Sequence, residues 1–140
     1  MSYKIQIKEK IPTIEEYQLL RNSVGWSKVS NNAVEKSLKN SIFSVCALLD
    51  EEVVGFGRII GDDGIYYYIQ DVMVFPKHQK KGIGRQIMDR LMDFLENHAD
   101  ETAFFGLMAA KGNSRFYEPY GFMKRPYDAP GMFRYCKAKK

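Results

Sequence analysis

Hydrophobic and polar residues follow two different rhythms along this chain, and each rhythm predicts a different kind of element. Short apolar runs rich in β-branched and aromatic residues occur at 3–8, 42–49, 53–60 and 65–75. Such runs are typical of strands, and the last three are separated only by the turn sequences DEE and GDDG. These three strands are expected to pair as an antiparallel meander.

Two short helices are predicted between the first and second strands. Thr13 and Glu16 have the spacing of a capping box, in which the two residues satisfy each other's backbone N–H groups at a helix start. A helix is therefore expected directly after Thr13, and a second one from about Asn31 to Leu38. Trp26 lies on the loop between them.

After Pro76 the rhythm becomes helical. Apolar residues recur at Ile83, Ile87, Leu91, Phe94 and Leu95. This spacing predicts an amphipathic helix of about four turns.

The order of elements predicts the fold class. A strand at 103–109 and a short helix at 113–120 follow the long helix, and Met123 and residues 132–137 are expected to supply the last strands. The resulting order, β-α-α-β-β-β-α-β-α-β-β, predicts one α/β (α+β mixed) domain over residues 1–140. Its central sheet is expected to be mixed but mostly antiparallel, with about four helices around it.

The composition argues against several classes of protein. The chain of 140 residues is 45% hydrophobic and 27% charged, which argues against disorder and disulfide scaffolds. No apolar run approaches the roughly 18 residues of a membrane span, and the first ten residues lack the apolar stretch of a signal peptide. Cys46 and Cys136 lie in apolar runs, so both are expected to be buried thiols in a reducing compartment. A cytoplasmic protein with no membrane contact and no metal site is expected.

The net charge is +4, and the positively charged residues cluster in one part of the chain. Four cations without an acid among them lie where the third meander strand leads into the long helix: Lys77, Lys80, Lys81 and Arg85. A helix start already carries positive partial charge, so cations are unfavourable there unless an anion binds. Gly82 and Gly84 would let the backbone approach such an anion closely. A solvated basic turn is the alternative.

Two known glycine motifs do not fit this loop. A dinucleotide fingerprint would need a third glycine where Ile87 stands, and a phosphate-binding Walker loop would need Lys followed by Ser or Thr directly after Gly84. The loop also lacks the stacking aromatic residues that accompany basic patches in nucleic-acid binders. No nucleic-acid partner is expected.

Two motifs together identify a resemblance. Gln79-x-x-Gly82-x-Gly84 is similar to the acyl-CoA loop of the GNAT superfamily of N-acetyltransferases, and NSRFYEPYGF at 113–122 resembles a second segment of that family. The resemblance implies an acetyl-CoA-dependent enzyme whose sheet splays between the strand before the loop and the next strand, at 103–109.

The resemblance also implies the residues that bind the acetyl-CoA co-substrate. The loop amides would bind the pyrophosphate, and the backbone of the preceding strand would pair with the pantetheine arm. Residues after the long helix would touch the arm, with Asn113 equally suited to cap the short helix. The implied set is Val72, Met73, Val74, Gln79, Lys80, Lys81, Gly82, Ile83, Gly84, Arg85, Asn113, Phe116 and Tyr117.

Two catalytic roles follow from the same resemblance. Tyr117 matches the family tyrosine that protonates the departing CoA thiolate, and a phenol with a pKa near 10 is protonated at pH 7. A core tyrosine is the alternative. Asp71 is the candidate base for the amine, with its side chain expected to point away from Val72 and Val74. A strand-edge or bulge acid with its own hydrogen bonds is the alternative.

The acceptor is predicted less sharply. Candidates for contact with the acceptor are residues 25–27, residues 127–132 and the tyrosines at 66–68. Tyr67 is expected to face away from its two neighbours. Most of these aromatic residues are expected to complete the core. The strand sequence IQDV and the terminal GMFRY resemble a subgroup that includes plastid-type arylalkylamine acetyltransferases. The aromatic residues and the scarcity of acids, rather than this short match, favour a small, aromatic or amphipathic primary amine over a polycation. The alternative acceptor is a protein lysine or N-terminus. A non-catalytic acyl-CoA-binding module is the alternative function, and a homodimer is a further possibility.

Overall fold

A computed structural model of the protein describes residues 4–137. These fall into two compact units, one ending at Met108 and the other beginning at Ala109, and each is described by itself. The single domain over residues 1–140 stays a prediction. The first unit contains β1 (Ile5–Glu9), α1 (Ile14–Ser23), α2 (Asn31–Lys39), β2 (Phe43–Leu49), β3 (Glu52–Gly61), β4 (Tyr66–Val74), the short 3-10 helix η1 (Pro76–His78), α3 (Ile83–His98) and β5 (Phe104–Leu107). The second contains α4 (Ser114–Tyr117) and the 3-10 helix η2 (Glu118–Tyr120).

The five strands form one sheet in the order β1-β2-β3-β4-β5. All neighbours are antiparallel except β4 and β5, which are parallel. The exception follows from the connection: α3 crosses over between β4 and β5 and returns the chain in the same direction. The prediction of a mixed, mostly antiparallel sheet with four helices is confirmed.

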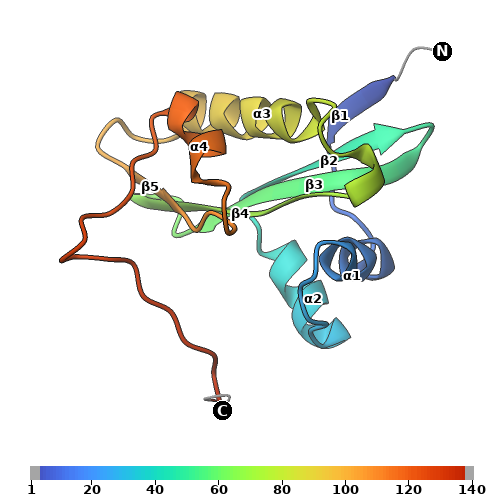
Figure 1. Ribbon diagram of the computed structural model, residues 1–140, viewed down its shortest axis with the longest axis horizontal. Helices are drawn as coiled ribbons and strands as arrows, with labels where there is room; N and C mark the ends of the chain where they lie inside the picture. The colour runs from blue at the N-terminus through green and yellow to red at the C-terminus, as the bar shows by residue number, and fades with distance from the viewer. Residues whose placement is uncertain (1–3, 138–140) are drawn as a thin grey trace. The chain divides into compact units, whose positions relative to one another are not determined.

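Helices cover both faces of this sheet, with α1 and α2 on one face and α3 on the other (Figure 1). On the α1 and α2 face, Tyr17 and Leu20 of α1 pack into a core cluster with Phe56 of β3 and Met73 of β4. Thr13 starts α1 with the predicted capping box: Glu16 N–H donates to Thr13 Oγ1 at 3.0 Å, and Thr13 N–H donates to Glu16 Oε1 at 2.8 Å.

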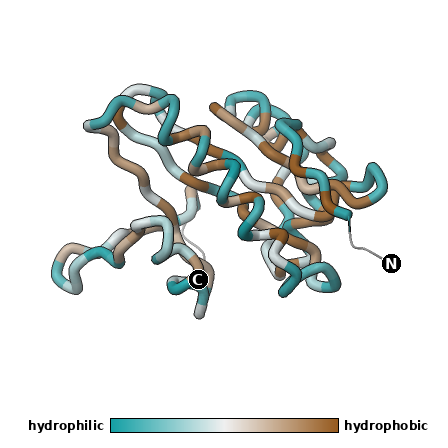
Figure 2. The backbone as a smooth tube through the Cα atoms, turned by 90° about the horizontal axis from the view of Figure 1, so that it is seen from above, coloured by the Kyte–Doolittle hydropathy of each residue, from teal (hydrophilic) through white to brown (hydrophobic). Residues whose placement is uncertain are grey.

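On the other face, α3 buries the predicted apolar stripe. Ile83, Ile87, Leu91 and Leu95 are all buried, and Figure 2 shows hydrophobic and hydrophilic positions alternating along this helix. Phe94 stacks on Phe43 of β2 with ring centroids 4.2 Å apart. Within residues 4–137, no helix is long and apolar enough to cross a membrane.

Two glycines of β3 let α3 lie close to the sheet. A Cβ atom added to Gly57 would be 2.7 Å from Cγ2 of Ile87 and 3.1 Å from Cδ1 of Leu91, and one added to Gly55 would be 3.1 Å from Cδ1 of Ile87. Real Cβ atoms essentially never come as close as 2.7 Å, and 3.1 Å is tighter than most of their contacts. The bare backbone of β3 thus sets the distance between the helix and the strands.

The strands predicted at Met123 and 132–137 are wrong. The described part of this segment has no strand, and Met123 is 89% exposed. A strand needs a partner backbone, and proline within such a run weakens it by removing a donor. Pro126 and Pro130 interrupt this segment, so its apolar residues do not form ladder hydrogen bonds.

Gly57→Ala should destabilise the protein by about 1–3 kcal/mol, because the added methyl overpacks the contact with Ile87. Urea unfolding followed by circular dichroism measures the change. Gly64→Ala is the matched control, since a Cβ there would meet only Oδ1 of Asp62 at 3.6 Å. Equal stability of the two variants would contradict this account of the helix position.

Candidate active site

Strand β4 carries a bulge near its middle. The register with β3 shifts between Phe56 and Arg58, so Asp71 and Val72 lie opposite Gly57 alone. Two residues against one is the arrangement of a β-bulge. Asp71 has a φ of 60°, a left-handed conformation that costs a residue other than glycine about 1 kcal/mol. The backbone here is held away from its intrinsic preference.

The side chains of Asp71 and Val72 point to opposite faces of the sheet. Val72 approaches within 3.5 Å of the Cβ position of Gly57, on the face that α3 covers. The carboxylate of Asp71 instead meets Tyr17 of α1, on the other face. The prediction that Asp71 points away from Val72 is confirmed.

Two residues before the bulge, the pairing of β4 with β5 ends. The parallel register runs from Tyr66 and Phe104 to Ile69 and Leu107, whereas β4 continues to Val74. Among the pairings of residues 4–137, no strand joins this edge of β4 after Ile69. This is the predicted splay, and it leaves the backbone of residues 70–74 without a strand partner on one side.

The carboxylate of Asp71 is buried and accepts three hydrogen bonds. Tyr17 Oη donates to Oδ2 at 2.7 Å, Arg58 Nε donates to Oδ2 at 2.8 Å, and Gln70 Nε2 donates to Oδ1 at 3.1 Å. The side chain of Asp71 is 1% exposed and that of Arg58 is 7% exposed. Arg58 and Asp71 therefore form a buried ion pair, and Tyr17 of α1 adds a further hydrogen bond to the carboxylate.

This network reaches further into the first unit. Arg58 Nη1 donates to the carbonyl oxygen of Ser37, in α2, and to Oγ of Ser41, both at 3.1 Å. Burial, and next the charge of Asp71, raise the pKa of the Tyr17 phenol, so its hydroxyl stays a donor. Sequence reasoning missed Arg58 and Tyr17. The available signal was the single charge of Arg58 in the apolar run at 53–60.

The loop after β4 is tied back to the strand. Gln79 Nε2 donates to the carbonyl oxygen of Val74 at 2.9 Å. Lys80 and Gly82 have φ values of 63° and 82°, and these left-handed residues turn the chain into α3. No protein atom lies within 4 Å of a Cβ placed on Gly82. The loop therefore presents open backbone at the start of α3.

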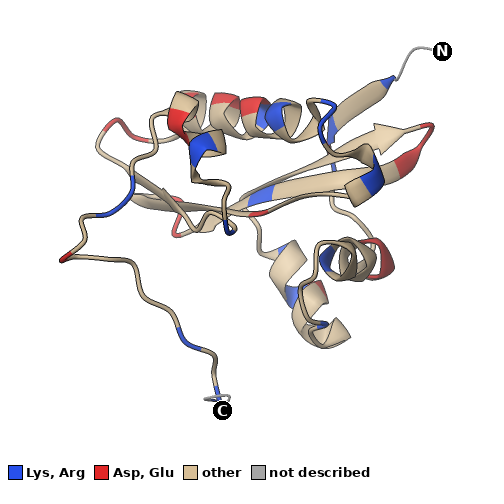
Figure 3. Cartoon of the chain, viewed as in Figure 1, with Lys and Arg blue, Asp and Glu red and all other residues tan. Residues whose placement is uncertain are grey.

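The electrostatics of this helix start favour an anion. Gly82 is the N-cap of α3 and supplies no side-chain cap, and no acid lies in the first turn. Lys77, Lys80, Lys81 and Arg85 place positive charge on the loop and the first turn (Figure 3). Exposed N–H groups, the helix dipole and cations all attract phosphate oxygens. The loop residues fit the pyrophosphate group that the sequence motif implied.

The second unit carries the other predicted residues. Tyr117 lies in α4, with its ring centroid 4.9 Å from that of Phe116 and 6.4 Å from that of Phe122. Burial raises the pKa of the Tyr117 phenol above its usual value near 10. Asn113 is the N-cap residue of α4, but its side chain makes no capping hydrogen bond.

Of the aromatic residues considered for the acceptor, Trp26 and Tyr67 pack into the core, whereas Tyr66 and Tyr127 do not. Trp26 packs against the core cluster, with the Arg21 guanidinium 5.5 Å from its ring centroid. Tyr67 is buried on the α3 face, where its ring meets those of His98 and Phe105 edge-on. Tyr66 is exposed and contacts Phe104. Tyr127, in the second unit, is fully exposed.

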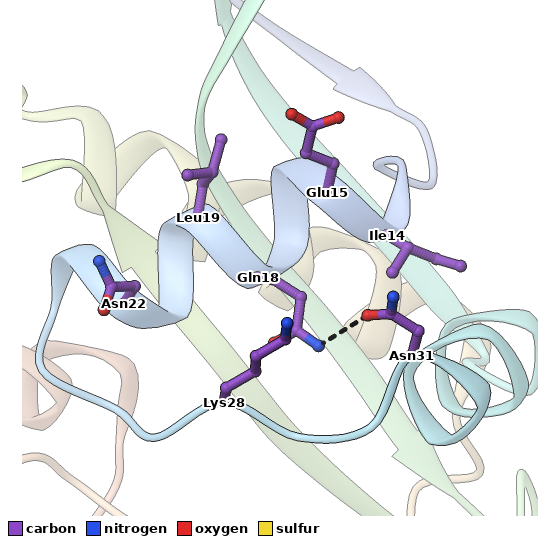
Figure 4. Close-up of a pocket in the computed structure, with 7 residues that line it drawn as sticks. All are labelled: Ile14, Glu15, Gln18, Leu19, Asn22, Lys28 and Asn31. Atoms are coloured by element: carbon purple, nitrogen blue, oxygen red, sulfur yellow. Dashed lines mark hydrogen bonds between the residues drawn. The ribbon is translucent and has the colours of Figure 1, made fainter.

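A hollow on the outer side of α1 was not foreseen from the sequence. It has a volume of about 560 Å³ and lies between α1 and the segment that leads to α2 (Figure 4). It is lined by Ile14, Glu15, Gln18, Leu19, Asn22, Lys28 and Asn31. Helical spacing places Glu15, Leu19 and Asn22 on the side of α1 opposite Tyr17 and Leu20, whereas Ile14 lies at the border and packs against the core cluster. The hollow is therefore separate from the Asp71 network.

The two cysteines differ from one another. Cys46 is buried as predicted, and burial raises the pKa of its thiol to about 12. Cys136 is exposed, so the prediction of a buried thiol is wrong there, because its segment pairs with no strand. Across residues 4–137, no cluster of three or more His, Cys, Asp or Glu side chains could hold a metal.

Comparisons with known proteins identify the family. A family profile described as an acetyltransferase (GNAT) domain matches residues 13–136. The uncharacterised N-acetyltransferase ycf52 of Pyropia yezoensis is 32% identical over 124 residues, which cover 86% of this chain and 70% of that protein.

Two solved structures share the fold and about a third of the sequence. A Staphylococcus aureus protein of unknown function, described as a probable acetyltransferase, has a TM-score of 0.88 and 32% identity over 93% of this chain and 98% of that one. A GNAT family acetyltransferase from Streptococcus pneumoniae has a TM-score of 0.76 and 30% identity, covering 93% of this chain and 96% of that one.

The splayed sheet and the glycine loop at the start of α3 define an acyltransferase. More particularly, this chain belongs to the GNAT family of N-acetyltransferases. The resemblance stated from the two sequence motifs is confirmed.

In the native protein at pH 8, a thiol reagent such as iodoacetamide should label Cys136 and spare Cys46. With a pKa of about 12 and no exposure, Cys46 offers little thiolate to the reagent. Intact mass measures the number of labels. Cys136→Ser should abolish labelling and Cys46→Ser should leave it unchanged, whereas two labels on the folded protein would refute the burial of Cys46.

Proposed function

We propose that the protein transfers an acetyl group from acetyl-CoA to the primary amine of a small molecule. One observation carries this proposal: the open edge of β4 leads directly into the basic glycine loop, and Gln79 fastens the two together. Together they offer paired recognition of an extended, amide-bearing arm and of a diphosphate.

The strand edge suits the pantetheine arm because of its backbone. Met73 and Val74 have buried side chains, so only their backbone groups are offered toward the splay. An arm with two amide groups can add to such an edge as another strand does. A backbone N–H near Met73 would then polarise the thioester carbonyl.

The reaction is a direct acyl transfer. The amine nitrogen attacks the thioester carbon, a C–N bond forms, the C–S bond breaks, and the amine proton is lost. Holding both substrates together in one site supplies most of the rate enhancement. Tyr117 is assigned the proton that the departing thiolate takes up. This role rests on the sequence motif and on the raised pKa of the phenol, which keeps it protonated.

The base that removes the amine proton stays a prediction. Asp71 was the candidate, and its carboxylate already accepts hydrogen bonds from Tyr17 and Arg58. A proton arriving from the amine would have to compete with both donors. Ordered water relaying the proton is the simpler route at this position.

The preference for a small amine rests on the surface beside the splay. Tyr66 and Tyr68 project from the β4 face opposite α3, and Tyr66 contacts Phe104 of β5. Aromatic rings accommodate aromatic or amphipathic amines. A polycationic peptide would need a cluster of acids, and Asp71 on this face is already neutralised by Arg58.

Turnover of acetyl-CoA with a panel of amines tests the proposal. The panel contains arylalkylamines, aliphatic diamines, and peptides with a free lysine or N-terminus. Acetylated product is followed by mass spectrometry, because the exposed Cys136 would interfere with thiol dyes. The highest kcat/KM is expected for arylalkylamines. A preference for peptides would show that the acceptor is a protein amine rather than a small molecule. Failure to bind CoA at all would show that acetyl-CoA is not the donor.

Tyr117→Phe should lower kcat about 100-fold between pH 6 and 9, because the thiolate loses its proton donor. The raised pKa of Tyr117 keeps the wild-type phenol protonated below pH 10, so no decline assignable to this group is expected up to pH 9. Tyr120→Phe, on the same segment, is the control and should retain activity. An unchanged kcat in Tyr117→Phe would exclude the general-acid role.

A further inference from the structure

Arg58 and Tyr17 lie outside both sequence motifs, yet both contact the one residue that shapes the bulge of β4. We propose that Arg58 and Tyr17 are positioning residues for acyl-CoA binding: they hold Asp71, and through it the bulge that aims residues 72–74 at the pantetheine arm. This inference rests on the proposed function, because it takes that segment as the part of the protein that binds the arm.

The bulge needs a restraint because its backbone is strained. Asp71 has a φ of 60°, and a residue other than glycine keeps this conformation only where its surroundings determine it. A strand that lost the extra residue of the bulge would shift its register by one position. Such a shift exchanges the two faces of every following residue. Val72, Met73 and Val74 would then present different backbone groups to the splay.

The restraint converges on one carboxylate oxygen. Oδ2 of Asp71 accepts from Tyr17 Oη at 2.7 Å and from Arg58 Nε at 2.8 Å. These donors come from α1 and β3, so the extra residue of β4 is fixed from two other elements. The Tyr17 ring is held in turn by an edge-on contact with Phe56, with centroids 6.0 Å apart.

The guanidinium of Arg58 is itself fixed at its far end. Nη1 donates to the Ser37 carbonyl oxygen and to Ser41 Oγ, while Nε faces Asp71. A planar guanidinium held at both ends cannot rotate away from the carboxylate. A buried ion pair often adds little net stability over apolar residues of the same volume, and in some proteins such a pair is kept for the geometry that it specifies. Position rather than stability is therefore the expected function of this pair.

Two substitutions of Arg58 separate the contact with Asp71 from the loss of charge. Glutamine Nε2 occupies the same place along its side chain as arginine Nε, so Arg58→Gln can keep the hydrogen bond to Asp71. Arg58→Met has a similar length and no donor. Both variants lose the charge and the contacts with Ser37 and Ser41, and they differ in the one bond that the proposal concerns.

The probe is binding, measured by calorimetry without an acceptor amine. CoA contains the pantetheine arm, whereas adenosine 3′,5′-bisphosphate contains only the nucleotide end. Arg58→Met should raise the Kd for CoA about 10-fold relative to Arg58→Gln, as expected for loss of a hydrogen bond to a charged group. The Kd for adenosine 3′,5′-bisphosphate should be the same in both variants.

Tyr17→Phe provides a second variant that leaves the ion pair intact. It removes the other donor to Asp71 and should raise the Kd for CoA about threefold to tenfold, again with unchanged binding of adenosine 3′,5′-bisphosphate. If Arg58→Met does not fold, this variant decides the question. Arg90→Met is the matched control, because Arg90 lies over the Phe43 ring, at 5.7 Å from its centroid, away from this network.

The outcomes separate this inference from the proposed function. If wild-type protein binds neither CoA nor adenosine 3′,5′-bisphosphate, the proposed function itself is rejected. If the wild type binds both, equal CoA affinities for Arg58→Met and Arg58→Gln would overturn the positioning role. A parallel loss of both ligands would also overturn it, because the effect would then be general rather than confined to the arm.

Discussion

The buried contact between Arg58 and Asp71 is the constraint on which the arrangement of the site depends. Two opposite charges are removed from water, which is unfavourable unless each finds further partners. Arg58 finds Ser37 and Ser41, and Asp71 finds Tyr17. Three elements are thereby fastened to a single residue of β4. The same residue carries the strained backbone of the bulge, and it lies two residues after the last pairing of β4 with β5.

The features that could be predicted from the sequence are local ones. The apolar stripe of α3 and the capping box of α1 depend on spacings of three or four residues, and both are present. The basic glycine loop is likewise contiguous, so its motif identified the family directly. The face of Asp71 followed from strand alternation. Such features can be predicted because they depend on residues close together in the sequence and not on distant partners.

The parts that escaped prediction depend on distant partners. Arg58 and Asp71 are 13 residues apart, and Tyr17 lies 54 residues from Asp71. The alternative of a bulge acid with its own hydrogen bonds describes Asp71 correctly. Its partners could not be named, because their meeting requires the register of β3 with β4, which alternation alone does not give. The prediction of strands after Gly121 was wrong for a related reason. Its apolar residues resemble strands one by one, but a strand exists only with a neighbour, and the described residues supply none there.

The bulge has a consequence for the behaviour of the protein in concentrated solution. A central strand with an open edge, such as β4 beyond Ile69, is a template on which a strand of another molecule can pair. A regular edge of five residues would invite copies to associate through it. The kink at Asp71 interrupts that edge and increases its twist, which discourages such pairing. The irregularity at Asp71 is therefore of the kind that disfavours edge-to-edge pairing between copies of the protein.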